Sequence, residues 1–199
     1  MQRSPKAILG GGSSAPAPTK ENLMALYEKN WIDDWYAGAA EKEEYRKKGK
    51  KLLEKFFDAN CGPEMKIPLH IEQDFNLKVG DVTMRGAIDR IDPTDGGVEI
   101  IDYKTGKTKT KKDVDTEQLV IYHMAACEVL GYRPVKLTYY YLESGDTVSF
   151  TANRKDEEDL KMDILKTVEK IRNSDFQATP SESVCKFCDF RDICDFRAL

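Results

Sequence analysis

The apolar residues of this chain change their spacing at Pro68, and that change limits the folds it can adopt. Upstream, two segments within residues 19–60 repeat their apolar residues at helical spacing, which predicts two helices. Downstream, residues 69–79 and 81–91 alternate apolar and polar side chains, and a short apolar run follows at 97–105. Glycine-rich turns separate these three segments, so the sequence predicts a three-stranded meander.

A further helix and a strand pair are predicted after the meander. Residues 115–132 have helical spacing, with Asp115 as an N-cap candidate and Gly131 where the helix should end. Two strands joined by a turn are predicted within residues 135–152, and a long charged helix within 154–173. Strands and helices thus follow one another in the order expected of an α/β domain.

Length and composition favour a folded protein with one main core. The chain has 199 residues, of which 33% are charged and 40% hydrophobic, as is typical of globular domains. A net charge of −4 argues against wholesale coating of nucleic acid, although lysines cluster between residues 104 and 112. No apolar run approaches the ~20 residues that span a bilayer, so we expect no membrane association and a cytoplasmic location.

Changes in composition predict four parts of the chain. The segment GGGSSAPAPT, residues 10–19, has the composition of a flexible linker. Three cysteines gather in the last fifteen residues. The predicted parts are a flexible segment at 1–20, a helical part at 21–63, a core at 64–176 and a cysteine-rich tail at 177–199.

Two acids and a lysine stand near the ends of neighbouring predicted strands. Antiparallel pairing of these strands could bring Asp89 and Asp102 side by side, and alternation puts Lys104 on the same face as Asp102. Paired carboxylates suit a hard divalent cation such as Mg²⁺, and a nearby ammonium suits phosphodiester hydrolysis. The alternative is a set of surface charges in which Asp102 and Lys104 form an exposed pair of little energetic value.

The helix predicted after the third strand carries two further polar groups. Gln118 and Tyr122 are four residues apart and therefore share one face of that helix. The helix could turn this face towards the lysine or a phosphate. Alternatively, Tyr122 is a core residue and Gln118 is incidental.

The stretches GAIDRID, EIIDYKTGK and QLVIY, in this order and spacing, resemble the RecB-type branch of the PD-(D/E)XK nucleases. The resemblance covers roughly residues 64–199. It implies a restriction-endonuclease-like α/β core with a mixed central sheet flanked by helices, which agrees with the predicted order of elements. By motif, it implies two metal-binding acids, a catalytic lysine and a following polar pair: Asp89, Asp102, Lys104, Gln118 and Tyr122.

Two residues of the first predicted strand are additional metal-ligand candidates. Glu72 matches an acid that often precedes the first motif in this family, but it could equally be a solvent-facing strand residue. A histidine that usually helps to bind metal is absent from the corresponding region. His70 could replace it, or it could be an ordinary polar strand residue.

The tail cysteines form a C-x2-C-x5-C array of Cys185, Cys188 and Cys194. Thiolates so arranged suit zinc or an iron–sulfur cluster, and both usually need four protein ligands. The resemblance implies a [4Fe–4S] cluster with a distant upstream cysteine, for which Cys61 is the candidate, because Cys127 is expected in the core. Cys61 is not at the family position, so we expect an N-terminal truncation or rearrangement and little or no iron. The tail would be mobile or would pack as a short helix through Phe187, Phe190 and Ile193.

Three functions are compared on this basis. The first is an Mg- or Mn-dependent DNA nuclease acting on single strands or ends, with exonuclease preferred over endonuclease action. The second is a non-catalytic DNA-binding or iron–sulfur module that serves a helicase or another DNA-repair or CRISPR-associated partner; the third is a zinc-ribbon-like interaction protein. A basic tract after the lysine could guide the DNA backbone or could be a solvated loop, and its candidate residues are Lys107, Lys109, Lys111 and Lys112.

Overall fold

The computed structural model describes residues 18–34, 36–62 and 65–198. The flexible segment predicted at 1–20 therefore lies, up to residue 17, outside the described residues. The chain divides into two compact units, the second of which begins at Lys161.

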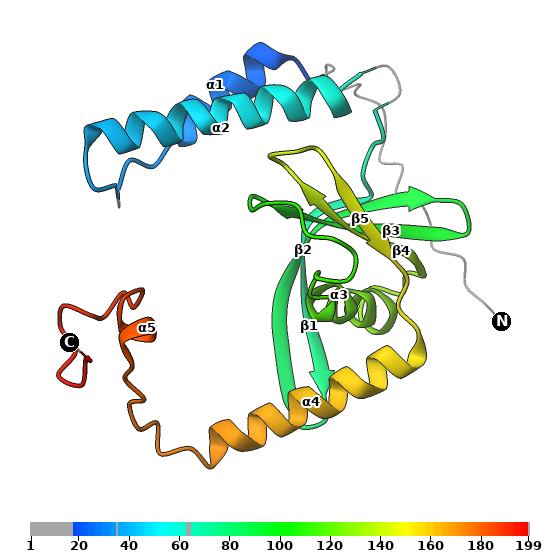
Figure 1. The fold of residues 1–199 in the computed structure, drawn as a ribbon. Coiled ribbons are helices and arrows are strands. Elements are labelled where there is room, and N and C mark those ends of the chain that lie inside the picture. The colour runs from blue at the N-terminus through cyan, green and yellow to red at the C-terminus, as the bar shows by residue number, and fades with distance from the viewer. Residues whose placement is uncertain (1–17, 35, 63–64, 199) are drawn as a thin grey trace. The chain divides into compact units, whose positions relative to one another are not determined.

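The first unit is built around a mixed five-stranded sheet with the order β1-β2-β3-β4-β5 (Figure 1). Strands β1 to β3 are antiparallel neighbours, β3 and β4 are parallel, and β5 returns antiparallel to β4. The crossover between the two parallel strands contains α3. The strands are β1 (His70–Val79), β2 (Val82–Thr94), β3 (Gly97–Lys104), β4 (Pro134–Tyr141) and β5 (Thr147–Phe150).

The predicted meander is confirmed, together with the turns that connect its strands. Gly80 and Gly96 occupy those turns with φ angles of 61° and 77°, which residues with a Cβ rarely adopt. The strands bury their apolar side chains on the face covered by α3, so that α/β packing supplies the core. The fully buried large side chains of this core are Tyr139, Leu77, Ile88, Ile91, Ile100, Leu119, Met124 and Leu137.

Helix α3 (Glu117–Glu128) packs on β1, β3 and β4, and the ring of Tyr122 contacts Phe75 at 5.8 Å between centroids. Its N-cap is Thr116 rather than the predicted Asp115. The Asp115 carboxylate instead accepts a hydrogen bond from the backbone N–H of Glu117, at 3.0 Å, within the first turn. Asp115 therefore still stabilises the helix start, but from one position further out.

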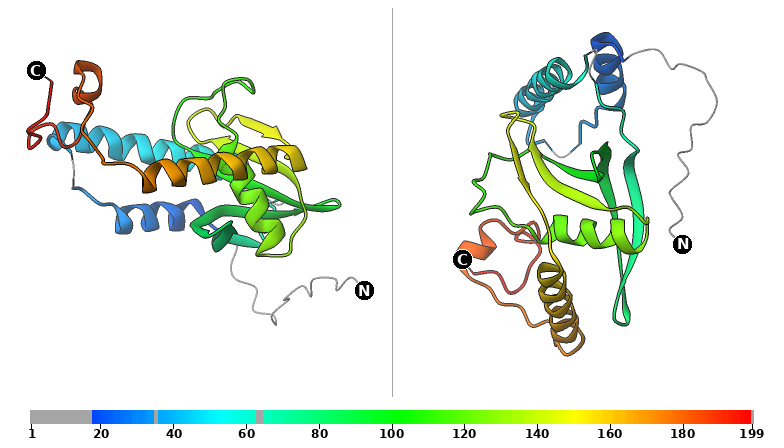
Figure 2. Two further views of the ribbon diagram at one scale, coloured as in Figure 1. Left: turned by 90° about the horizontal axis from the view of Figure 1, so that it is seen from below. Right: turned by 90° about the vertical axis from the view of Figure 1, so that its right-hand side faces the viewer.

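Helix α2 (Ala39–Asn60) packs on the other face of the sheet. Phe56 meets the rings of Tyr103 and Tyr140 edge to face, with centroids 5.6 and 5.7 Å away. Asn60 donates a hydrogen bond to the hydroxyl of Tyr140 at 3.0 Å. Because neighbouring strand residues point to opposite faces, these contacts put Tyr103 opposite to Asp102 and Lys104. The sheet accordingly lies between α2 and α3 in Figure 1 and in the right-hand view of Figure 2.

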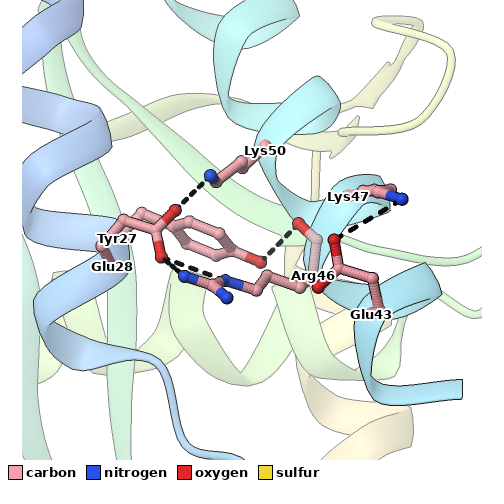
Figure 3. Close-up of polar contacts among 6 residues, drawn as sticks. All are labelled: Tyr27, Glu28, Glu43, Arg46, Lys47 and Lys50. Atoms are coloured by element: carbon pink, nitrogen blue, oxygen red, sulfur yellow. Dashed lines mark hydrogen bonds and ion pairs between the residues drawn. The ribbon is translucent and has the colours of Figure 1, made fainter. Parts of the chain in front are cut away.

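Helix α1 (Lys20–Asn30) is attached to α2 by polar contacts (Figure 3). Glu28 pairs with both Arg46 and Lys50, and the hydroxyl of Tyr27 donates to the backbone carbonyl of Arg46 at 3.0 Å. The hydroxyl of Thr19 caps the helix by accepting from the backbone N–H of Asn22.

One glycine of the sheet leaves no room for a side chain. A Cβ on Gly97 would lie 2.1 Å from the backbone oxygen of Arg133, and that oxygen accepts the hydrogen bond of Val98 N–H. We expect Gly97→Ala to lower the free energy of unfolding by about 1–3 kcal/mol, because backbone must shift to relieve the clash. Urea unfolding would measure this against Gly106→Ala, whose Cβ meets no atom within 4 Å; equal stabilities would contradict the close approach.

The second unit holds most of α4 (Arg154–Arg172), which crosses the division, and the short α5 (Glu182–Cys185). The tail was expected to be mobile or to form a short helix through Phe187, Phe190 and Ile193, and the helical alternative is wrong. The helix ends before these residues, and their side chains are 81%, 67% and 80% exposed. Among the helices of the described residues, none is long and apolar enough to cross a membrane.

Candidate active site

Three acids lie at corresponding positions on β1, β2 and β3. In the β1–β2 ladder, Ile71 pairs with Arg90 and Gln73 with Ile88, so Glu72 falls opposite Asp89. In the β2–β3 ladder, recorded pairing ends at Arg90 and Ile101, and its continuation puts Asp102 opposite Asp89. The register therefore brings the acids of three strands into one row.

Asp102 is the buried acid of this row, with only 2% of the residue exposed. One oxygen, Oδ2, lies 2.7 Å from the Lys104 ammonium in an ion pair that lacks the direction of a hydrogen bond. Burial raises the pKa of Asp102, and the negative charge of Asp89 raises it further, while Lys104 acts in the opposite direction. The alternative of an exposed surface pair is thus wrong for Asp102.

Asp89 stands where β2 and β3 separate. Its Oδ2 accepts a hydrogen bond from the backbone N–H of Tyr103 at 2.8 Å. The carboxylate thereby satisfies a donor that regular strand pairing would otherwise use, and it is oriented by that bond. This hydrogen bond holds the Asp89 carboxylate in a defined place next to Asp102.

Lys104 connects the acids to α3. Its ammonium donates to Oε1 of Gln118 at 2.6 Å and lies 4.9 Å from the centre of the Tyr139 ring. The other end of the Gln118 amide donates to the hydroxyl of Tyr122 at 2.9 Å. The predicted polar face of this helix therefore meets the lysine, and three partners hold the ammonium in position.

Glu72 reaches the row through an unusual backbone. Its φ angle is 50°, a left-handed conformation that is uncommon outside glycine and that often marks functional positions. Burial raises the pKa of the Tyr122 hydroxyl, and the charges of Asp102, Asp89 and Glu72 raise it further. The charge of Glu72 thus acts on the same hydroxyl as the charges of the two aspartates.

His70 has a different partner. Its Nε2 lies 2.7 Å from the hydroxyl of Tyr132, and the two rings are in contact. The structure thus engages the imidazole in a polar pair, and binding a metal through this nitrogen would require that pair to break.

A cavity of about 510 Å³ opens beside Lys104. Two lysines of the basic tract, Lys107 and Lys109, line it together with Gln118 and Tyr139. Lys111 and Lys112 are exposed but are not among its lining residues. The structure thus separates the four predicted DNA-binding lysines into two that face this cavity and two that do not.

The donor set of the row fits a hard divalent cation. Asp89 and Asp102 supply carboxylate oxygens, the ligand type that Mg²⁺ and Mn²⁺ prefer, and Oδ2 of Asp102 is buried without a hydrogen bond. Among the described residues, no three His, Cys, Asp or Glu side chains are assembled closely enough to hold a metal ion. A bound cation would thus rely on the two aspartates and on other oxygens, such as water or phosphate.

The predicted iron–sulfur ligands are three tail cysteines and Cys61. All five cysteines are unpaired, and Cys185, Cys188 and Cys194 do not form a ligand group within the described part of the chain. Cys185 is buried, and its sulfur accepts a contact from the backbone N–H of Ala198 at 3.4 Å. Cys61, the candidate fourth ligand, is half-buried at the C-terminal end of α2.

Cys127 is not the core residue that helical spacing predicted. It is exposed on α3, with its sulfur 3.7 Å from Nε2 of His123. That imidazole nitrogen also lies 3.1 Å from a carboxylate oxygen of Glu157. Cys127 falls just outside the buried stripe of α3, which consists of Leu119, Val120, Tyr122, Met124, Ala125 and Ala126.

Tyr139 is a site residue that the sequence reasoning missed. It pairs in register with Asp102 across the parallel β3–β4 ladder and lies beneath the Lys104 ammonium. The run of three tyrosines at 139–141 was visible in the sequence, but nothing local indicated which of them would face the lysine.

The chain is similar in sequence to a known protein family and to two phage proteins. The model of the PD-(D/E)XK nuclease superfamily matches residues 6–195. The Gene 69 proteins of Mycobacterium phages D29 and L5 are 27% and 24% identical over 171 and 143 residues, or 80% and 69% of this chain. The chain spans 62% and 48% of the lengths of these two relatives.

Among solved structures, the crystal structure of SSO0001 is similar with a TM-score of 0.43 and 20% identity, covering 90% of this chain and 82% of that chain. The family match extends over most of the chain and includes both acids, the lysine and the two residues of α3. The chain belongs to the PD-(D/E)XK nuclease superfamily.

Proposed function

We propose that this protein is a metal-dependent DNA nuclease of the RecB type that hydrolyses phosphodiester bonds in single strands or at DNA ends, as an exonuclease. One observation carries the proposal: Asp89, Asp102 and Lys104 are adjacent on two strands, and Gln118 holds the lysine from α3. This constellation combines ligands for a hard cation with a positioned positive charge, as phosphoryl chemistry requires.

Asp89 and Asp102 would hold Mg²⁺ or Mn²⁺, with Glu72 as a further acid of the same row. The metal supplies an activated water at neutral pH and charge stabilisation for the phosphate. The protein's own contribution is the placement of charge. Lys104 is held by Asp102, Gln118 and the Tyr139 ring, so its ammonium is ready to stabilise the negative charge that develops on a phosphate.

Gln118 and Tyr122 act as positioning residues in this proposal. The Gln118 amide accepts from the lysine and donates to the tyrosine hydroxyl, which sets the orientation of the amide. Tyr122 is itself buried against Phe75. The hydrogen bonds from Tyr122 through Gln118 to Lys104 therefore start from a fixed side chain. Loss of either residue should weaken turnover more than metal binding.

The basic tract should guide the DNA backbone through two of its four lysines. We expect the double variant Lys107→Gln/Lys109→Gln to weaken DNA binding and to reduce the dependence of log Kd on log salt by about one per lost phosphate contact. Fluorescence anisotropy with labelled single strands at several salt concentrations would measure both effects. The matched control is Lys111→Gln/Lys112→Gln, which removes the same charge outside the cavity. Equal losses of DNA affinity in the two variants would mean that the tract attracts DNA by its overall charge and not through the two lysines of the cavity.

The direct test of the proposed function is cleavage of end-labelled single- and double-stranded DNA in the presence of Mg²⁺, Mn²⁺ or EDTA. Cleavage with metal and none with EDTA is expected, and circular single strands should resist an exonuclease. No cleavage of any DNA with either metal would contradict the proposal. The alternative is a non-catalytic DNA-binding or iron–sulfur module that serves a helicase or CRISPR-associated partner, and metal-dependent cleavage by the purified protein would contradict it.

A further inference from the structure

A second cavity, of about 320 Å³, has Asp89 among its lining residues. We propose that it receives one unstacked nucleobase of the DNA strand being cleaved. The inference rests on the proposed function and extends it by naming single-stranded DNA as the preferred substrate.

The cavity is formed where α2 approaches the first three strands. Leu53 and Phe56 come from α2, Ile71 from β1 and Tyr103 from β3, and Leu142 closes it. Its surface is almost entirely apolar, and the polar residues at its border are Asp89 and Arg90. A volume of this size is at the lower end of the range of small-molecule sites, and it suits a flat apolar ligand more than an extended peptide.

The walls have the chemistry that a nucleobase requires. Phe56 and Tyr103 meet edge to face with centroids 5.6 Å apart, so they offer aromatic surface in fixed orientations. The Tyr103 hydroxyl accepts from Arg90, and that guanidinium is held in turn by Asp92 at 2.6 Å. Bases stack on such aromatic and aliphatic surfaces with little regard to sequence.

Ile71 is 67% exposed although it borders this cavity. A ligand that covers this side chain would remove its apolar surface from water, which favours binding. It immediately precedes Glu72, whose left-handed backbone belongs to the row of acids. The exposed apolar side chain and one acid of the row are thus neighbours in the chain.

Position relative to the acids selects DNA as the occupant. Asp89 lines the apolar cavity, and its carboxylate is bonded to the backbone N–H of Tyr103, another lining residue. Lys104 follows Tyr103 directly and lines the basic cavity. The apolar cavity therefore borders Asp89, and the basic cavity borders Lys104, the ion-pair partner of Asp102. Apolar and cationic surfaces next to the two acids match the bases and phosphates of one strand. A paired base inside a duplex would have to unstack before it could enter, at a cost of a few kcal/mol.

The experiment combines substitution with removal of single bases. Single-stranded oligonucleotides carry one abasic site at successive positions around the cut, and cleavage by the parent and Ile71→Ser is compared under Mg²⁺. We expect Ile71→Ser to raise KM about fivefold or more on intact strands, because the base would no longer cover apolar surface at this position. On the oligonucleotide whose abasic site removes the seated base, parent and variant should be equal. The matched control is Ile67→Ser, because Ile67 is 76% exposed and does not line the cavity.

The outcomes separate this inference from the proposed function. If the parent cleaves no DNA, the proposed function fails and the inference with it. If the parent cleaves but no abasic position removes the difference between parent and variant, only the base site is wrong. Equal loss of activity by Ile71→Ser on intact, abasic and duplex substrates would mean that the residue is structural and would overturn the base site. Cleavage of blunt duplexes as fast as single strands would also overturn it.

Discussion

Replacing Asp102 by asparagine is expected to reduce DNA cleavage by about 10³-fold or more, because a neutral amide cannot replace a carboxylate around a divalent cation. The fold should survive. Asp102 is buried and its pKa is raised by burial, so its ionised form is unfavourable in the folded protein. Single-turnover cleavage of a labelled single strand would measure the loss.

The same substitution has a stability consequence with a defined sign. A carboxyl group whose pKa is raised by folding binds more protons in the folded chain than in the unfolded chain. Its contribution to stability is therefore present at low pH and is lost as pH rises through the raised pKa. At neutral pH the asparagine avoids this loss, so the Tm of Asp102→Asn in EDTA should equal or exceed that of the parent.

The matched control for this variant is Asp74→Asn, which makes the same replacement of a carboxylate by an amide in an exposed residue of β1. It should retain both activity and Tm. Unchanged cleavage by Asp102→Asn would contradict the metal site, and a fall in its Tm in EDTA would contradict the sign derived from the raised pKa.

Much of the first unit could be predicted from sequence because its signals are local. Alternation defines each strand of the meander, and glycines with positive φ at 80 and 96 define the turns between them. Once two strands pair across a short turn, the register follows, and Asp89 comes opposite Asp102. Lys104 then shares the face of Asp102 by alternation alone.

Features that depend on long-range packing could not be predicted in this way. The parallel pairing of Asp102 with Tyr139 depends on how α3 crosses the sheet, because that helix lies between β3 and β4 in the chain. The left-handed Glu72 leaves no trace in the pattern of its strand. Cys127 shares its helical spacing with buried residues, yet the sheet does not extend over it. The cavity beside Asp89 requires α2, whose place on the sheet is set by Phe56 and Asn60.

Lys104→Ala is expected to lower the rate of cleavage by about 10²–10³-fold, the usual loss when one group that stabilises transition-state charge is removed. Metal binding should be retained, since an ammonium is not a ligand. The affinity for the metal should even increase, because the Lys104 ammonium competes with the cation for the Asp102 carboxylate. Calorimetric titration with Mn²⁺ would measure the affinity, and Lys78→Ala, which removes an exposed lysine of β1, is the matched control.

The lysine's partners make this prediction more specific than a simple loss of activity. Gln118 accepts from Lys104 and donates to Tyr122, so Gln118→Ala should release the ammonium while leaving it in the site. Its effect on turnover should be smaller than that of Lys104→Ala, and the double variant should be no slower than Lys104→Ala alone, because both changes act through one group. Additive losses would mean that Gln118 contacts the DNA independently. Lost Mn²⁺ affinity in Lys104→Ala would instead make the lysine a structural support of the acids, with a different group stabilising the phosphate.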